Sequence, residues 1–172
     1  MVDLFVYHFA ADSGTPGASG IRIVSVEEAT EKQRISRTVL EALPEWFGIP
    51  EAREQYIKES AEQPFFAALD AEKAIGFLCL KETGKETVEL SVLGVLKDYH
   101  GKGVGRKLFE RAKKATRNYG YSFMQVKTVQ MGRYPEYDAT NRFYRSLGFK
   151  EFELFPTLWD ERNPCQIYVM HL

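Results

Sequence analysis

One stretch near the middle of the chain limits the folds it can adopt, because a strand pattern runs into a glycine-rich turn and then into a helix pattern. Residues 88–95 alternate apolar and polar side chains, which is typical of a half-buried strand. From Val104 onward, apolar residues recur at helical spacing. Between the two patterns lie Gly101, Gly103 and Gly105. Glycine lets the backbone approach a ligand, and a helix start offers unpaired N–H groups, so this junction predicts a phosphate-binding site.

The glycine spacing excludes the two best-known phosphate motifs. A dinucleotide motif needs glycines at its first, third and sixth positions, but counting from Gly101 or Gly103 puts Arg106 or Leu108 at the sixth. The P-loop needs Gly-Lys-Ser/Thr after four spacer residues, and that pattern does not occur here. For the loop taken alone, a tight strand-to-helix turn without a ligand is the alternative interpretation.

Two segments resemble the GNAT family of N-acetyltransferases. The first is similar to the coenzyme A loop of that family, Arg/Gln-x-x-Gly-x-Gly/Ala, with His100 in first place, Gly103 in fourth and Gly105 in sixth. The second, residues 139–149, resembles the last motif of the family, a short helix that carries Asn and Tyr and ends in Gly-Phe. The resemblance covers about residues 21–172. It implies an α/β fold of one domain, with a mixed, mostly antiparallel sheet flanked by helices.

Length and composition indicate one domain preceded by an extension, and the resemblance implies that it is an acetyltransferase domain. A chain of 172 residues can bury enough surface to fold without a disulfide or a metal. Residues 12–20 are small and polar like a linker, so residues 1–20 are interpreted as an N-terminal extension of unknown role and residues 21–172 as the domain. Cys79 and Cys165 match no metal or redox spacing, and we expect no metal.

The charge pattern argues against nucleic acid and membrane partners. The net charge of −1 creates no general field for either, and no apolar run is long enough to span a bilayer. The first ten residues lack the basic start of a signal peptide, so we expect a cytoplasmic protein. Residues 97–117 hold eight basic and two acidic residues, which fits either a rim for coenzyme phosphates or a solvated helix face. A homodimer is left open.

Local patterns predict alternating strands and helices, several of them joined by turns too short for parallel crossovers. Strands are expected at 2–10, 21–26, 64–69, 74–81, 87–95, 123–129, 150–155 and 166–171, and helices at 26–43, 51–62, 103–118 and 139–147. The segment Pro44–Pro50 is expected to be a loop, and residues 83–85 a turn.

The resemblance implies acetyl-CoA as co-substrate. Backbone N–H groups of the glycine loop would hold the pyrophosphate, the N–H of Val95 would polarise the acetyl carbonyl, and Asn141 would contact the pantetheine or adenosine side. The full set of predicted coenzyme-binding residues is Leu93, Val95, His100, Gly101, Lys102, Gly103, Val104, Gly105, Arg106 and Asn141.

Direct acetyl transfer also needs an acid for the leaving thiolate and a base for the amine. By resemblance, Tyr144 is the predicted acid, and a phenol with a pKa of about 10 can protonate a thiolate whose conjugate acid has a pKa of about 8.5. By resemblance, Glu89 occupies the strand position of the glutamate base, with Glu45, Glu51 and Asp160 as competitors. A tyrosine that only packs its ring, and a glutamate at a sheet edge, are the alternatives.

The acceptor site is assigned by resemblance to two loops that each contain a tryptophan. The predicted substrate-binding residues are Trp46, Phe47 and Trp159, and the acids beside them favour a cationic amine. Core packing of both indoles explains them equally well. The sequence therefore predicts an acetyl-CoA-dependent N-acetyltransferase for a small primary amine. A peptide or protein amine acetyltransferase and a non-catalytic coenzyme A-binding regulatory domain remain alternatives.

Overall fold

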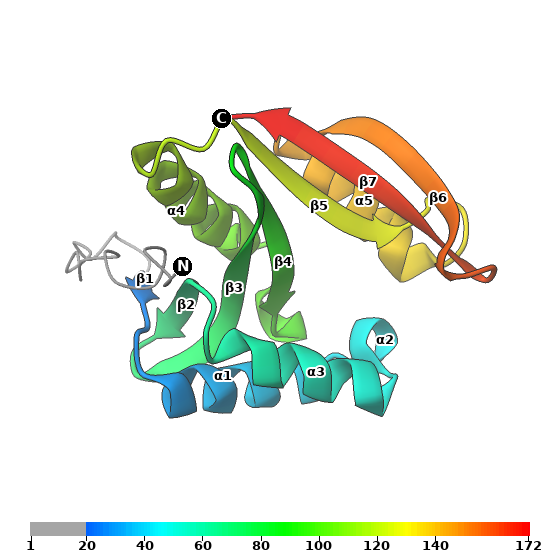
Figure 1. The fold of residues 1–172 in the computed structure, drawn as a ribbon. Coiled ribbons are helices and arrows are strands. Elements are labelled where there is room, and N and C mark those ends of the chain that lie inside the picture. The colour runs from blue at the N-terminus through cyan, green and yellow to red at the C-terminus, as the bar shows by residue number, and fades with distance from the viewer. Residues whose placement is uncertain (1–19) are drawn as a thin grey trace. The chain divides into compact units, whose positions relative to one another are not determined.

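The computed structural model describes residues 20–172 (Figure 1). The extension expected over residues 1–20, with the strand expected at 2–10, therefore lies outside the described residues apart from Gly20. Within the described part, helices flank a mixed, mostly antiparallel sheet of seven strands in the order β1-β2-β3-β4-β5-β7-β6. The predicted fold class is confirmed. The elements are β1 (Ile21–Ser25), α1 (Ala29–Glu41), α2 (Pro44–Phe47), α3 (Pro50–Ser60), β2 (Phe65–Asp70), β3 (Lys73–Gly84), β4 (Thr87–Val95), the 3-10 turn η1 (Lys97–Tyr99), α4 (Val104–Asn118), β5 (Phe123–Val129), α5 (Pro135–Ser146), β6 (Lys150–Asp160) and β7 (Asn163–His171).

The chain divides into two compact units, which are described separately. The first unit holds the described residues up to Lys81 together with Val92–Ala115, and the second holds Glu82–Ser91 and Thr116–Leu172. Strands β3 and β4 each begin in one unit and end in the other.

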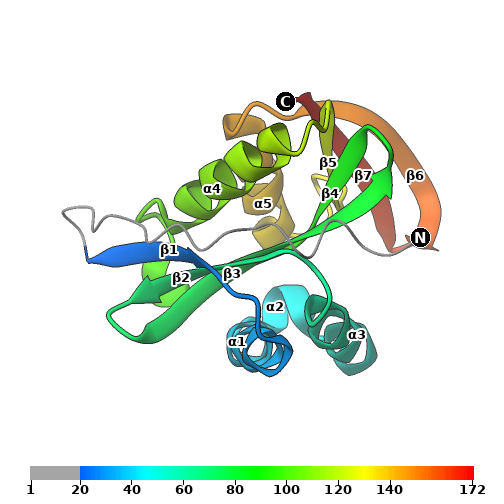
Figure 2. The ribbon, with the colours of Figure 1, turned by 60° about the vertical axis from the view of Figure 1, so that its left-hand side comes forward.

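In the first unit, β1 pairs with β2 and β2 pairs with β3, both antiparallel. Helices α1 and α3 lie together on one face of these strands, and α4 lies on the other (Figure 2). Helix α1 buries Ile35, Val39 and Leu40 against the sheet, while its remaining face is polar. Its start is capped by Glu28, whose side chain accepts a hydrogen bond from the N–H of Glu31 at 2.7 Å. Apolar burial of this kind supplies most of the stability of a surface helix.

A lysine lies in this core. Lys32 on α1 is only 1% exposed, and its Nζ donates to the carbonyls of Gln63 at 2.9 Å and Ala61 at 3.4 Å, just after α3. Burial lowers the pKa of the Lys32 ammonium, because removal from water disfavours the charged form. The side chain thus connects α1 to the end of α3 through backbone acceptors.

In the second unit, β7 pairs antiparallel with both β5 and β6. Helix α5 packs on this sheet, where the Tyr168 hydroxyl donates to the Asn141 side chain at 2.7 Å. Strand β6 is the edge strand, and it is largely exposed along its length. Its pairing with β7 shifts register twice, and Pro156 lies within it. The exposed apolar side chains of this strand are Phe152, Leu154, Leu158 and Trp159.

Several element boundaries differ from the sequence-based expectations. The expected loop at Pro44–Pro50 contains a short helix, α2, because Pro44 begins this helix instead of only ending the preceding one. The turn expected at residues 83–85 is wrong at its start, since β3 continues to Gly84. Helix α5 begins at Pro135, four residues earlier than expected, again with proline in the first turn. Pro44 and Pro135 are thus both residues of a helix start.

Candidate active site

The glycine loop between β4 and α4 has the backbone conformation that glycine allows. Gly101 has a φ of +71° and Gly103 a φ of +79°, and a Cβ atom added at either position would meet nothing within 4 Å. These two glycines are therefore required by the backbone conformation rather than by crowding. Helix α4 begins at Val104, and the N–H of Lys107 makes a helical bond to the carbonyl of Gly103 at 3.0 Å. The N–H groups of Val104 and Gly105 thus belong to the open first turn of the helix.

The loop is anchored just before the glycines. In η1 the Tyr99 hydroxyl donates to Asp70 at the end of β2 at 2.7 Å, and this hydrogen bond is the main cause that raises the pKa of Tyr99. The ammonium of Lys102 lies 5.3 Å from the centre of the Tyr99 ring, within cation–π range. The start of the loop is therefore tied to the sheet, while Gly101 and Gly103 remain open to solvent.

His100 lies at the first position of the loop and contacts the end of β4. Its Nε2 is 2.6 Å from the carbonyl oxygen of Val95. Its ring meets the Trp46 ring edge-on, with 5.8 Å between the ring centres. The structure therefore brings three of the predicted site residues together in the first unit. The contact of His100 with Val95 is a hydrogen bond to a backbone carbonyl.

The strand segment before the loop is held close to its neighbour. A Cβ atom added to Gly76 on β3 would lie 2.8 Å from the carbonyl oxygen of Gly94 and 3.2 Å from the Cα of Val95. A Cβ at Gly94 would lie 2.9 Å from the side chain of Val39 on α1. Gly94 makes room for α1, and Gly76 allows the backbones to approach.

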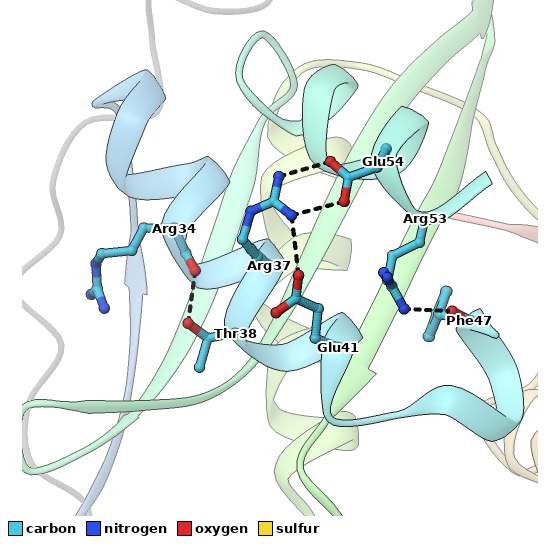
Figure 3. A network of polar contacts seen from close by, with 7 residues as sticks. All are labelled: Arg34, Arg37, Thr38, Glu41, Phe47, Arg53 and Glu54. Atoms are coloured by element: carbon cyan, nitrogen blue, oxygen red, sulfur yellow. Dashed lines mark hydrogen bonds and ion pairs between the residues drawn. The ribbon is translucent and has the colours of Figure 1, made fainter. Parts of the chain in front are cut away.

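Helix α2 holds Trp46 and Phe47, both half-buried. Phe47 packs edge-on against Tyr56 of α3, and its carbonyl accepts a hydrogen bond from Arg53 at 3.5 Å. Figure 3 shows this contact beside the Arg37 network, in which Arg37 of α1 donates to Glu54 of α3 through two nitrogens at 2.7 Å each. These contacts fix α2 and α3 against α1. The predicted acceptor wall in the first unit is thus a packed assembly.

Glu89, the predicted base, lies in the second unit within a polar cluster. Its Oε2 accepts from Nζ of Lys127 at 2.6 Å and from the side chain of Gln125 at 3.1 Å. The Glu89 side chain is only 13% exposed and that of Lys127 is 29% exposed. Sequence analysis missed Lys127, although a lysine in the apolar pattern of β5 is a signal that could have identified it. A role for Glu89 as base stays a prediction, and it would require Lys127 to release the carboxylate.

Asn141 and Tyr144 share the buried face of α5, as their spacing predicts. The amide of Asn141 donates to the carbonyls of Val129 at 2.9 Å and Tyr137 at 2.7 Å, and its oxygen accepts from Tyr168. Each polar atom of this side chain therefore has a protein partner. The coenzyme contact predicted for Asn141 stays a prediction, and its established contacts link α5 to β5 and β7.

Tyr144 is 6% exposed and packs between the rings of Phe143 and Phe149, with ring centres 5.7 and 5.9 Å away. On the same helix, Asn141, Tyr144 and Leu147 are buried and Phe143 is half-buried. The catalytic role of Tyr144 stays a prediction.

The remaining candidates are Trp159 and the three alternative bases, which are Asp160, Glu45 and Glu51. Trp159 is 45% exposed at the end of β6. Asp160 accepts from the backbone of Arg162 and from Asn163, and these bonds hold the pKa of its carboxyl below the usual range. Glu45 on α2 is ion-paired with Lys97, which lowers the pKa of Glu45. Glu51 is exposed in the first turn of α3. Of the competing bases, Asp160 and Glu45 are thus engaged by protein groups.

Two further observations concern cofactors and partners. Among residues 20–172, no group of His, Cys, Asp and Glu side chains is arranged to hold a metal ion. In the same part of the chain, no helix is long and apolar enough to cross a bilayer.

The basic side chains of α4 are partly used in packing, since Arg111 lies over the Phe66 ring and Lys113 over the Phe109 ring.

Solved structures place the fold among acetyltransferases. A GNAT-family acetyltransferase from Desulfovibrio desulfuricans superimposes with a TM-score of 0.74 at 18% identity, covering 88% of this chain and 98% of that one. An acetyltransferase from Streptococcus agalactiae gives 0.71 at 22% identity, covering 89% and 99%. A GNAT-family acetyltransferase from Elizabethkingia anophelis, solved with acetyl-CoA bound, gives 0.69 at 17% identity, also covering 89% and 99%. No curated protein matches the sequence.

A family model decides the assignment. The model described as "Acetyltransferase (GNAT) domain" matches residues 61–151, just over half of the chain. The chain belongs to the GNAT acetyltransferase family, and membership implies acyltransferase activity with acetyl-CoA as donor. The family resemblance inferred from the glycine loop and the Asn-Tyr helix is thereby confirmed.

Proposed function

We propose that this protein moves the acetyl group of acetyl-CoA directly to a primary amine of a small cationic molecule. The observation that carries the proposal is the loop before α4, where Gly101 and Gly103 take positive φ angles next to an open helix start. A Cβ atom added at either glycine would meet nothing within 4 Å, and this open space supports a pyrophosphate site there. Lys102 and Arg106 would add positive charge to this site.

The proposed chemistry forms one bond and breaks one. The neutral amine nitrogen attacks the thioester carbonyl carbon, the C–N bond forms, and the C–S bond then breaks with release of the thiolate. The Val95 N–H would stabilise the negative charge that develops on the carbonyl oxygen. The Tyr144 hydroxyl would give its proton to the thiolate, and Glu89 would accept the proton that the nitrogen loses. These roles rest on the positions of the residues in the family motifs.

The preference for a cation rests on the aromatic and acidic residues of the predicted acceptor walls. In the sequence, Trp46 and Phe47 of α2 lie close to Glu45 and Glu51, and Trp159 of β6 is followed by Asp160. Aromatic faces and carboxylates together favour an ammonium group. Because Glu45 is paired with Lys97, and Asp160 with its own turn, the net attraction is weaker than the sequence alone indicates. Polyamines, amino sugars and amino-acid derivatives are the expected classes.

A second candidate is a regulatory domain that binds coenzyme A without catalysis. The observation in its favour is the state of the polar residues in the second unit, where Glu89 is ion-paired and Asn141 is fully bonded to protein groups. Such a domain would bind acetyl-CoA and release no thiol. The cytoplasmic location and the homodimer stay predictions.

The experiment is a measurement of thiol release from acetyl-CoA with a panel of cationic amines, peptides and acidic acceptors, beside calorimetric titration of acetyl-CoA. We expect turnover with cationic amines. Trp46→Ala and Trp159→Ala should raise the acceptor KM more than the acetyl-CoA KM, whereas Phe152→Ala, at a 66% exposed position of β6, serves as control. Binding without turnover would favour the regulatory domain. Preference for a protein N-terminus or an acidic acceptor would contradict the proposed substrate class.

A further inference from the structure

We propose that His100 is a positioning residue, which holds the backbone at Val95 in the orientation that acetyl transfer needs, and is not a ligand of the coenzyme phosphates. This inference rests on the proposed function. It starts from the 2.6 Å contact between Nε2 of His100 and the carbonyl oxygen of Val95. A carbonyl oxygen only accepts hydrogen bonds, so Nε2 must carry the hydrogen.

The backbone direction at the end of β4 shows what this hydrogen bond holds. The next N–H, that of Leu96, donates to the carbonyl of Ile75 on β3 at 2.8 Å. Successive residues of a strand direct their backbone groups to opposite edges, so the N–H and C=O of Val95 point away from β3. The His100 side chain donates a hydrogen bond to the Val95 carbonyl on that edge. The Val95 N–H, the group proposed to polarise the thioester, lies on the same edge beside it.

The backbone at Val95 is therefore restrained on both sides. On one side β3 packs against it so closely that Gly76 could not carry a side chain without meeting Gly94 and Val95. On the other side stands the His100 ring, itself held edge-on by Trp46 of α2. The backbone N–H of His100 donates to the carbonyl of Lys97 at 3.0 Å, which fixes the position from which the ring reaches back. A donor that is fixed before the reaction loses no free energy to reorganisation in the transition state.

The same contact argues against a phosphate role. In a neutral imidazole one nitrogen carries the hydrogen and the other only accepts. Since Nε2–H is used by Val95, a neutral His100 has no donor left for a phosphate oxygen. The loop pattern of the family has Arg or Gln at this position, and both are also donors. A donor to the end of the preceding strand therefore explains the residue type without any contact to the ligand.

The variants His100→Phe and His100→Gln test the proposal. Phenylalanine keeps a ring against Trp46 and removes the donor, whereas glutamine keeps an N–H donor of similar reach. We expect His100→Phe to lower kcat roughly tenfold, as loss of one well-placed hydrogen bond would, and to leave the calorimetric Kd for coenzyme A within about twofold. His100→Gln should restore most of kcat. His171→Leu, at an exposed position of β7, controls for loss of a histidine.

An acetyl donor that lacks phosphate groups distinguishes a positioning role of His100 from a phosphate-binding role. With S-acetyl-pantetheine, a positioning role predicts the same fold-loss of kcat in His100→Phe as with acetyl-CoA. A phosphate role predicts a weaker Kd for coenzyme A and no loss with the truncated donor, and this result would overturn the inference. Equal losses in His100→Phe and His100→Gln would overturn it too. If His100→Phe does not fold, His100→Ala takes its place. Failure of the wild type to bind acetyl-CoA or release thiol would instead contradict the proposed function.

Discussion

At the scale of single residues, the sequence located the candidates better than it described their surroundings. Tyr144 and Asn141 were expected on one face of a helix, and they are, because helical spacing fixes that relation. The partners of these residues come from distant strands, as with Tyr168 for Asn141 and Lys127 for Glu89. Strand register is set by the whole sheet, so the local pattern of each segment did not pair these partners with Asn141 and Glu89.

The burial of Tyr144 leads to a prediction about its hydroxyl. If the phenol protonates the departing thiolate, Tyr144→Phe should lower kcat by roughly 10²- to 10⁴-fold, the usual range for general-acid catalysis. The affinity for acetyl-CoA should hardly change, since the proton is needed mainly in the transition state. Single-turnover kinetics with calorimetry of acetyl-CoA measures both quantities.

The control for this variant is its thermal midpoint, since Tyr144 lies between Phe143 and Phe149 and phenylalanine preserves that packing. A variant that transfers acetyl groups at the wild-type rate, under conditions where chemistry limits turnover, would assign Tyr144 to packing alone.

At the scale of elements, the junction from β4 through the glycines to α4 was predicted closely, since both patterns are long and regular. Short elements were not. Helix α2 has four residues, too few for a periodic pattern, and its first residue, Pro44, could equally mark the end of the preceding helix. Its position depends on tertiary contacts, such as those of Phe47 with Arg53 and Tyr56, that lie outside its own sequence.

The glycine loop carries a prediction of its own. Gly103→Ala should destabilise the protein by about 1 kcal/mol, because an L-residue at positive φ is strained even where the side chain has room. We expect acetyl-CoA binding to weaken as the loop relaxes to another conformation. Urea unfolding and calorimetric titration measure the two effects.

Gly84→Ala is the matched control, since Gly84 also has open space in front of it but lacks a positive φ. Loss of stability and affinity in both variants alike, or in neither, would show that the backbone angle at Gly103 is not the reason for its glycine.

At the scale of the whole molecule, the mixed sheet with helices on its faces followed from connection lengths, and the described residues confirm it. Cys79 is buried within the apolar strand β3. The lysine in the core was not foreseen. Helical spacing puts Lys32 on the same face of α1 as Ile35 and Val39, and the backbone carbonyls that follow α3 supply the hydrogen-bond partners of its buried Nζ.

Lys32 should make the stability of the whole molecule depend on alkaline pH. Its pKa in the folded protein is lowered from 10.5, so between the two pKa values the unfolded state binds more protons. The contribution of Lys32 to stability should therefore rise as pH increases through the lowered pKa towards 10.5. We expect the free energy of unfolding of the wild type, relative to Lys32→Met, to increase from pH 7 to pH 10.

Urea titrations of both proteins across this range, with Lys114→Met at an exposed position of α4 as control, measure the difference. A difference that stays constant or decreases with pH would show that the charged form of Lys32 is not disfavoured by folding.

The edge strand β6 has a consequence for the behaviour of the protein at high concentration. An exposed strand that carries Phe152, Leu154 and Leu158 offers the features that allow chains to add to one another in a growing fibril. Pro156 has no N–H to continue such a ladder, and the two register shifts bend the edge away from a flat template. Both features oppose the addition of further chains at this edge, although the apolar side chains of the strand are exposed.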